Sequence, residues 1–185
     1  LKPVQLYANI ATSTDYGRRN FKIMKISDSI VKAINEQIKA EYDSAYIYLA
    51  MSAYFEDQGL KGMAHWMKKQ YAEEVEHAEK FVNYLYERGA RVIIPEIAKP
   101  KDDYNDALDV FQTAYKHEQY VTSRIYNLVE QAVNEKDYAT QSFLKWYVDE
   151  QMEEEDNTSS IVNQLEFLGN DKHSVYMIDR ELASR

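Results

Sequence analysis

Apolar residues recur every three or four positions along most of the chain, a spacing that places them on one face of an α-helix. Residues that start or stop helices flank these segments: Ser27 or Asp28 can cap the first, Gly59 follows it and Gly89 follows the second. A shorter helix is expected over 174–183. The sequence therefore predicts an all-α protein. Its long helices are expected at 27–58, 61–88, about 105–134 and 138–168.

The connections between these helices indicate how they pack. The turns at 58–59 and 134–137 are short, so each joins two antiparallel helices. Between the two pairs, 89–103 contains Pro95 and Pro100 and has no helical period. A helix of about 28 residues is about 42 Å long and about 15 extended residues span about 50 Å, so this segment can run the length of a bundle. Two antiparallel hairpins joined by one long crossover is the connectivity of a ferritin-like four-helix bundle.

Each long helix carries a polar side chain able to bind metal on its apolar, inward stripe. These residues are Glu41 on the first helix, Glu74 and His77 on the second, Glu118 on the third and Gln151 on the fourth. A Glu-x-x-His pair such as Glu74 and His77 leaves one side of a helix, but it also occurs by chance on many helices. Four helices with such a residue near mid-length are harder to explain by chance.

Burial of these groups without a partner would cost several kcal/mol, and no Lys or Arg lies on the stripes beside the three glutamates. A metal ion is one candidate partner. Together the five side chains would form an oxygen-rich site for two hard or borderline divalent cations, with Glu74 able to bridge them.

Composition narrows the ligands and partners. The 185-residue chain has no cysteine, which excludes iron–sulfur clusters and thiolate zinc sites, so any metal is held by oxygen and imidazole ligands. The net charge of −9 argues against nucleic acid as a partner. The sequence contains no run of eighteen apolar residues, so a membrane-spanning helix is not expected. Residues 24–185 fit one domain. Residues 1–23 have four basic residues and one acidic residue, and they are interpreted as an N-terminal extension or leader. They lack the apolar core of a secretory signal, so a cytoplasmic location is expected.

At the candidate metal ligands the chain resembles the non-haem bacterial ferritins, and the resemblance covers nearly all of residues 24–185. It is carried by Tyr48 and by the segments NEQIKAE (35–41), EEVEH (73–77), YKHE (115–118) and FLKWYVDEQMEEE (143–155). Any one of these segments is a weak signal, whereas the combination is specific to that family.

The resemblance implies a role for each candidate catalytic residue of a ferroxidase centre. Glu41, Glu74 and His77 would hold the first iron, and Glu74, Glu118 and Gln151 the second. Tyr48 matches a tyrosine beside the diiron centre, as an electron donor or hydrogen-bond partner; a plain core tyrosine is the alternative. A third iron position on the cavity side would fall to Glu73, Glu150, Glu153 and Glu154. By helical angle Glu153 points away from the inward stripe of its helix.

Two departures separate the chain from other ferritins. Bacterioferritins resemble this layout but have a haem-ligating Met after the second-helix Glu and a second Glu-x-x-His, where this chain has Val75 and Glu150-Gln-Met-Glu153. The sequence therefore resembles the haem-free branch. Animal ferritins line a threefold entry channel with acidic residues at two positions that are Gln141 and Leu144 here. Entry of iron by that route is not supported.

The function implied by the resemblance is iron storage and detoxification. Fe(II) would be oxidised to Fe(III) by O2 or H2O2 at the diiron centre, and ferric oxyhydroxide would accumulate inside a homo-oligomeric cage of 24 subunits, with no haem cofactor. Two alternatives from other classes are a diiron oxidase that acts on another substrate and a metal-free helical scaffold. The first generally has a doubled Glu-x-x-His pattern, and the second needs basic partners for the inward acids.

Overall fold

The computed structural model describes residues 25–169 and 171–184, so the predicted leader at 1–23 lies outside the described residues. Within those two ranges the protein is all α-helical, as predicted. The helices are α1 (Asp28–Gln58), α2 (Lys61–Glu87), α3 (Ala107–Asn134), α4 (Tyr138–Leu168) and α5 (Lys172–Leu182).

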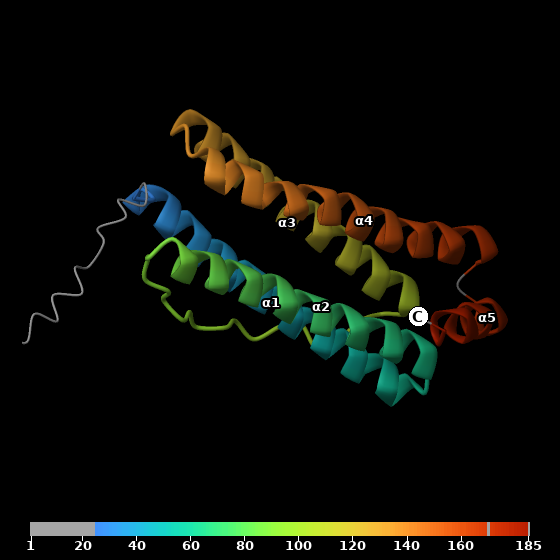
Figure 1. Ribbon diagram of the computed structural model, residues 1–185. Helices are drawn as coiled ribbons and strands as arrows, with labels where there is room; N and C mark the ends of the chain where they lie inside the picture. The colour runs from blue at the N-terminus through green and yellow to red at the C-terminus, as the bar shows by residue number, and fades with distance from the viewer. Residues whose placement is uncertain (1–24, 170, 185) are drawn as a thin grey trace, which may run out of the picture.

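The long helices form two antiparallel pairs, α1 with α2 and α3 with α4 (Figure 1). The pairs pack together through α1 with α3 and through side chains of α2 and α4, such as the stacked rings of Phe81 and Tyr147. The segment after α2 runs along the bundle to the start of α3, so α2 and α3 point in the same direction (Figure 1). This is the predicted four-helix bundle with one long crossover. The short α5 lies across one end of the bundle, where it packs against α2 and α4.

Two helix starts differ from the sequence prediction by about two residues. The third helix begins at Ala107 because the Asp106 side chain accepts a hydrogen bond from the Asp109 N–H at 2.8 Å and so caps it. The fifth begins at Lys172, since Asp171 accepts from the N–H groups of His173 and Ser174. By contrast, the first helix begins where expected, and of the two candidate caps it is Ser27 that accepts the hydrogen bond from the Ile30 N–H.

The apolar core is divided into two clusters by a layer of polar side chains near the middle of the bundle. In α1 one cluster ends at Ile38 and the other begins at Tyr48, with the buried Glu41 between them. In α3 one cluster ends at Ala114 and the other begins at Val121, with Glu118 between them. The candidate metal ligands therefore lie between two rigid apolar layers that fix the four helices around them.

The N-terminal end of α2 is held by α5. Leu60 provides no side-chain cap for α2, and instead the Asp179 carboxylate accepts a hydrogen bond from the Met63 N–H at 2.9 Å. Asp179 is buried. The close approach of α5 requires a glycine at position 62, because a Cβ there would lie 1.6 Å from the Asp179 carbonyl oxygen.

Replacement of Gly62 with Ala is therefore expected to destabilise the protein by about 1–3 kcal/mol through overpacking. Helix propensity alone predicts the opposite sign, a gain of about 1 kcal/mol for Ala over Gly. Guanidinium denaturation of the variant and the parent measures the sign, and limited proteolysis reports release of α5. A higher midpoint for the variant would contradict the close approach of the two helices.

None of the helices in the described part of the chain combines the length and the apolar character needed to cross a membrane.

Candidate metal centre

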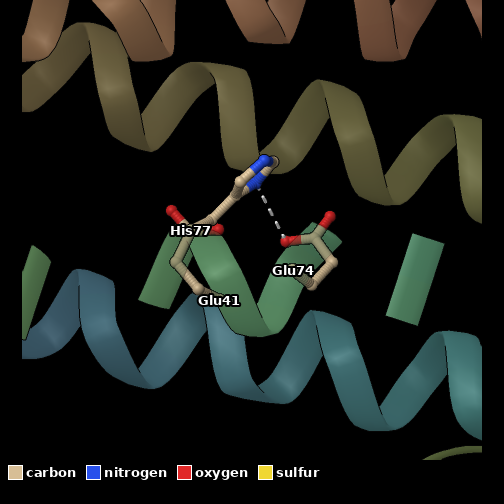
Figure 2. Close-up of side chains that lie close together, drawn as sticks. All are labelled: Glu41, Glu74 and His77. Carbon is tan, nitrogen blue, oxygen red and sulfur yellow. Dashed lines mark ion pairs between the residues drawn. The ribbon is translucent and has the colours of Figure 1, made fainter. Parts of the chain in front are cut away.

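Glu41 from α1 and Glu74 and His77 from α2 converge in the polar layer (Figure 2). One ligand atom of each residue lies within 4.8 Å of the others, and the three residues are 1%, 1% and 4% exposed. Glu74 and His77 are one helical turn apart, and Nδ1 of His77 lies 3.6 Å from Oε2 of Glu74. The structure therefore brings the first three predicted ligands together at a distance that suits a shared cation.

The other two predicted ligands lie on the opposite helix pair and contact each other. The Gln151 side-chain amide from α4 donates to Oε2 of Glu118 on α3 at 3.3 Å. The Tyr48 hydroxyl donates to the other oxygen of Glu118, so the tyrosine is tied to the site by a hydrogen bond as well as by packing. All three side chains are buried. The charge of Glu118 also raises the pKa values of Glu41 and Glu74, which places it close to both.

Burial sets the protonation of the site. It raises the pKa of Glu41 to about 7, against the opposing effect of hydrogen bonds to Gln37 and Glu74. Burial also raises the pKa of Glu74 well above its usual value, and the charges of Glu118, Glu41 and Glu154 add to that shift. The pKa of Glu118 is also raised, mainly by burial. Burial, helped by the charge of Lys80, lowers the pKa of His77 to about 4. The imidazole is therefore neutral at pH 7 and free to bind metal. The raised pKa values of the acids favour their protonated forms, and a bound cation would displace those protons.

Two carboxylate oxygens fit a cation better than they fit the surrounding protein. Oε2 of Glu41 and Oε2 of Glu74 are buried and receive no hydrogen bond from the described residues. Adjacent buried carboxylates either share a proton or bind a cation, since both cannot stay ionised and unpaired. Carboxylate oxygens with one imidazole suit Fe, Mn or Zn rather than a soft, thiolate-seeking metal. The donor set therefore fits iron.

The residues predicted for a third iron do not form one compact group. Glu154 is buried on the inward stripe of α4 and accepts a hydrogen bond from the Gln70 side-chain amide at 2.6 Å. Glu153 is exposed on the next face, and Glu73 and Glu150 are half-buried. Burial and then the charges of Glu153 and Glu73 raise the pKa of Glu150, so these three acids are neighbours. The third site stays a prediction.

Several contacts around the centre were not predicted from the sequence. The Gln37 side-chain amide donates to Oε1 of Glu41 at 2.9 Å, and Arg124 Nε donates to the Gln37 side-chain oxygen at 2.9 Å. The position of Gln37, four residues before Glu41, is the signal that could have revealed it. Trp146 lies edge-on to the His77 ring at 5.3 Å between centroids, with Lys80 Nζ 3.8 Å from the centroid of a Trp146 ring.

Comparison with known proteins agrees with this geometry. A protein-family model described as a ferritin-like domain matches residues 31–168. The chain belongs to the ferritin family. This confirms the resemblance that the sequence motifs predicted, and the ferritin fold agrees with the four long helices and short fifth helix.

Relatives of this ferritin come from bacteria and archaea. A Haemophilus influenzae protein named probable bacterial non-heme ferritin-like protein is 40% identical over 159 residues, which cover 86% of this chain and 96% of the relative. A Staphylococcus aureus protein named bacterial non-heme ferritin is 39% identical over 160 residues, covering 86% and 96%. A solved open pore ferritin from the archaeon Archaeoglobus fulgidus has a TM-score of 0.85 and 46% identity, covering 86% of this chain and 98% of that one.

Proposed function

We propose that this ferritin is an iron-storage ferroxidase that oxidises Fe(II) at the centre formed by α1–α4. The observation that carries the proposal is the pair of buried carboxylate oxygens without hydrogen-bond donors, on Glu41 and Glu74, next to a neutral His77. The names of the bacterial relatives, non-heme ferritins, support iron as the metal and the absence of haem.

The ligands divide between two iron positions that share one residue. Glu41, Glu74 and His77 bind one Fe(II), while Glu74, Glu118 and Gln151 bind the other. Each bound ion displaces protons from carboxyl groups with raised pKa values, and the ionised carboxylates then favour the more highly charged Fe(III). Two Fe(II) ions give up one electron each. One O2 takes both electrons and two protons to become H2O2. The H2O2 then takes two further electrons, one from each of two more Fe(II) ions, and two protons to become two molecules of water.

Storage of the ferric product requires an enclosed space that one bundle does not provide. We therefore propose a homo-oligomeric cage of 24 copies in the cytoplasm, assembled from the domain at 24–185. Glu73, Glu150, Glu153 and Glu154 would bind iron that has left or is approaching the centre. The raised pKa of Glu150 between neighbouring acids supports a local preference for cations.

The proposal is tested with the full chain and ferrous salt in air at pH 7. We expect ferric absorbance to rise much faster than in protein-free buffer, and the mineral to elute with a particle of several hundred kDa on size-exclusion chromatography. Oxidation no faster than in buffer would reject the ferroxidase. Elution as a monomer or dimer, with precipitated iron, would reject storage and favour an oxidase that acts on another substrate.

A further inference from the structure

Gln37 is a buried neighbour of the metal centre with a defined orientation. Its side chain is fully buried on α1, one turn before Glu41, and its Nε2 donates to Oε1 of Glu41 at 2.9 Å. One oxygen of the Glu41 carboxylate is therefore held by the protein. The other, Oε2, has no donor among the described residues and is left for a cation. The hydrogen bond thus decides which oxygen of Glu41 is available to metal.

Arg124 determines which way the Gln37 amide points. An amide side chain has a donor end and an acceptor end, whereas a guanidinium group only donates. Because Arg124 Nε donates to Oε1 of Gln37 at 2.9 Å, the amide nitrogen must face Glu41. A reversed amide would place N–H groups against the guanidinium and an oxygen against the carboxylate. Both contacts would be repulsive, so Arg124 selects the one useful orientation.

The surroundings of Arg124 suit a residue that orients the Gln37 amide better than one that forms an ion pair with a carboxylate. It lies half-buried on α3, beside a cavity of about 520 Å³ lined by α1, α3 and the crossover. Its guanidinium carbon is 5.7 Å from the centroid of the Tyr120 ring, and Nη1 donates to the Tyr120 hydroxyl at 3.3 Å. In the described part of the chain its hydrogen bonds go to Gln37 and Tyr120, not to a carboxylate.

We propose that Gln37 and Arg124 are positioning residues that hold Glu41 in the orientation needed to bind metal. A chain of two hydrogen bonds runs from the surface of α3 through the interior of α1 to the ligand. This inference rests on the proposed metal centre. It adds two residues that touch no metal but control a residue that does.

The test uses metal-free full-length protein titrated with Co2+ under anaerobic conditions, because Co2+ binding is followed by its visible absorption without oxidation. Removal of a hydrogen-bond partner of a metal ligand typically lowers metal affinity about 10–100-fold. We expect Gln37→Met and Arg124→Met each to weaken one of the two bound ions by about tenfold or more. The other ion, on the Glu118 and Gln151 side, should keep its affinity.

The double variant, Gln37→Met with Arg124→Met, tests whether Arg124 acts through Gln37 or whether the two residues affect metal binding independently. Because Arg124 acts through Gln37, the double variant should bind Co2+ no more weakly than Gln37→Met alone. Losses that multiply would overturn the proposal. Arg124 lies at the surface, so its variant tests the idea even where replacement of the buried Gln37 prevents folding. Thermal denaturation of each metal-free variant establishes that it is folded.

Lys39→Met is the matched control for charge. Lys39 lines the same cavity and forms an ion pair with Asp43, whereas the donor to the Gln37 oxygen is Arg124. Its replacement removes the same charge and should leave Co2+ affinity unchanged; a loss equal to that of Arg124→Met would overturn the proposal. The proposal would also be overturned if Gln37→Met bound Co2+ with the same affinity as the parent protein. If the parent protein binds no Co2+ at the centre, the proposed function fails instead.

Discussion

Replacement of Glu74 with Ala is expected to lower the initial rate of ferrous oxidation at least about a hundredfold, because loss of a direct ligand should exceed the 10–100-fold cost of losing a ligand's supporting partner. Glu74 is the one residue assigned to both iron positions. Without it, the first proposed iron position would keep only Glu41 and His77, and the second only Glu118 and Gln151. Two protein ligands are too few to hold either ion firmly, and the carboxylate that would bridge the two ions is lost. The rate is read from ferric absorbance under air at pH 7.

The control is Glu76→Ala, which removes a carboxylate from the same helix between the two ligands. Glu76 is exposed, so its loss should change the rate little. A rate for Glu74→Ala equal to that of the parent would show that the centre is not where iron is oxidised. Equal losses in both variants would assign the effect to the negative charge of α2 rather than to ligation.

The apolar period and the short turns made most of the bundle predictable. Helical spacing placed Glu41, Glu74 and Glu118 on inward stripes, and all three are buried as a result. Local signals were equally reliable where the interaction is local, as with the Ser27 cap and the left-handed Gly59, whose φ is 76°. Both kinds of signal depend on residues within a few positions of each other, which a sequence displays directly.

Contacts between distant segments were not predictable in the same way. Arg124 follows Glu118 by six residues, and nothing in the period of α3 indicates that its side chain reaches Gln37 on α1. Asp179 likewise caps α2 from α5. A helical period gives the face of a residue, but not the offset of one helix along another. The reach of a long side chain between helices depends on that offset.

Replacement of Glu41 with Gln is expected to stabilise the metal-free protein by about 3 kcal/mol at pH 8. Burial raises the pKa of Glu41 from 4.5 to about 7. Between these values the folded protein keeps a proton that the unfolded chain has released, so stability is lost as the pH rises through this range. The variant has no carboxyl group to ionise, and its amide oxygen still accepts from Gln37. Guanidinium denaturation at pH 5 and pH 8 measures the difference.

The dependence on pH identifies the cause. At pH 5 Glu41 is protonated in the folded parent, and the pH is only slightly above the pKa of 4.5 that it has in the unfolded chain. Little stability has yet been lost to ionisation, so the gain from the substitution should shrink to under about 1 kcal/mol. Glu130→Gln, on the exposed side of α3, should change stability by no more than about 0.5 kcal/mol at either pH. An equal gain at both values would indicate better packing instead of a removed charge. Addition of Co2+ should reverse the order at pH 8, since the parent chain gains binding energy that the variant largely lacks. The carboxylate that weakens the empty bundle is then the one that gives the loaded bundle its stability.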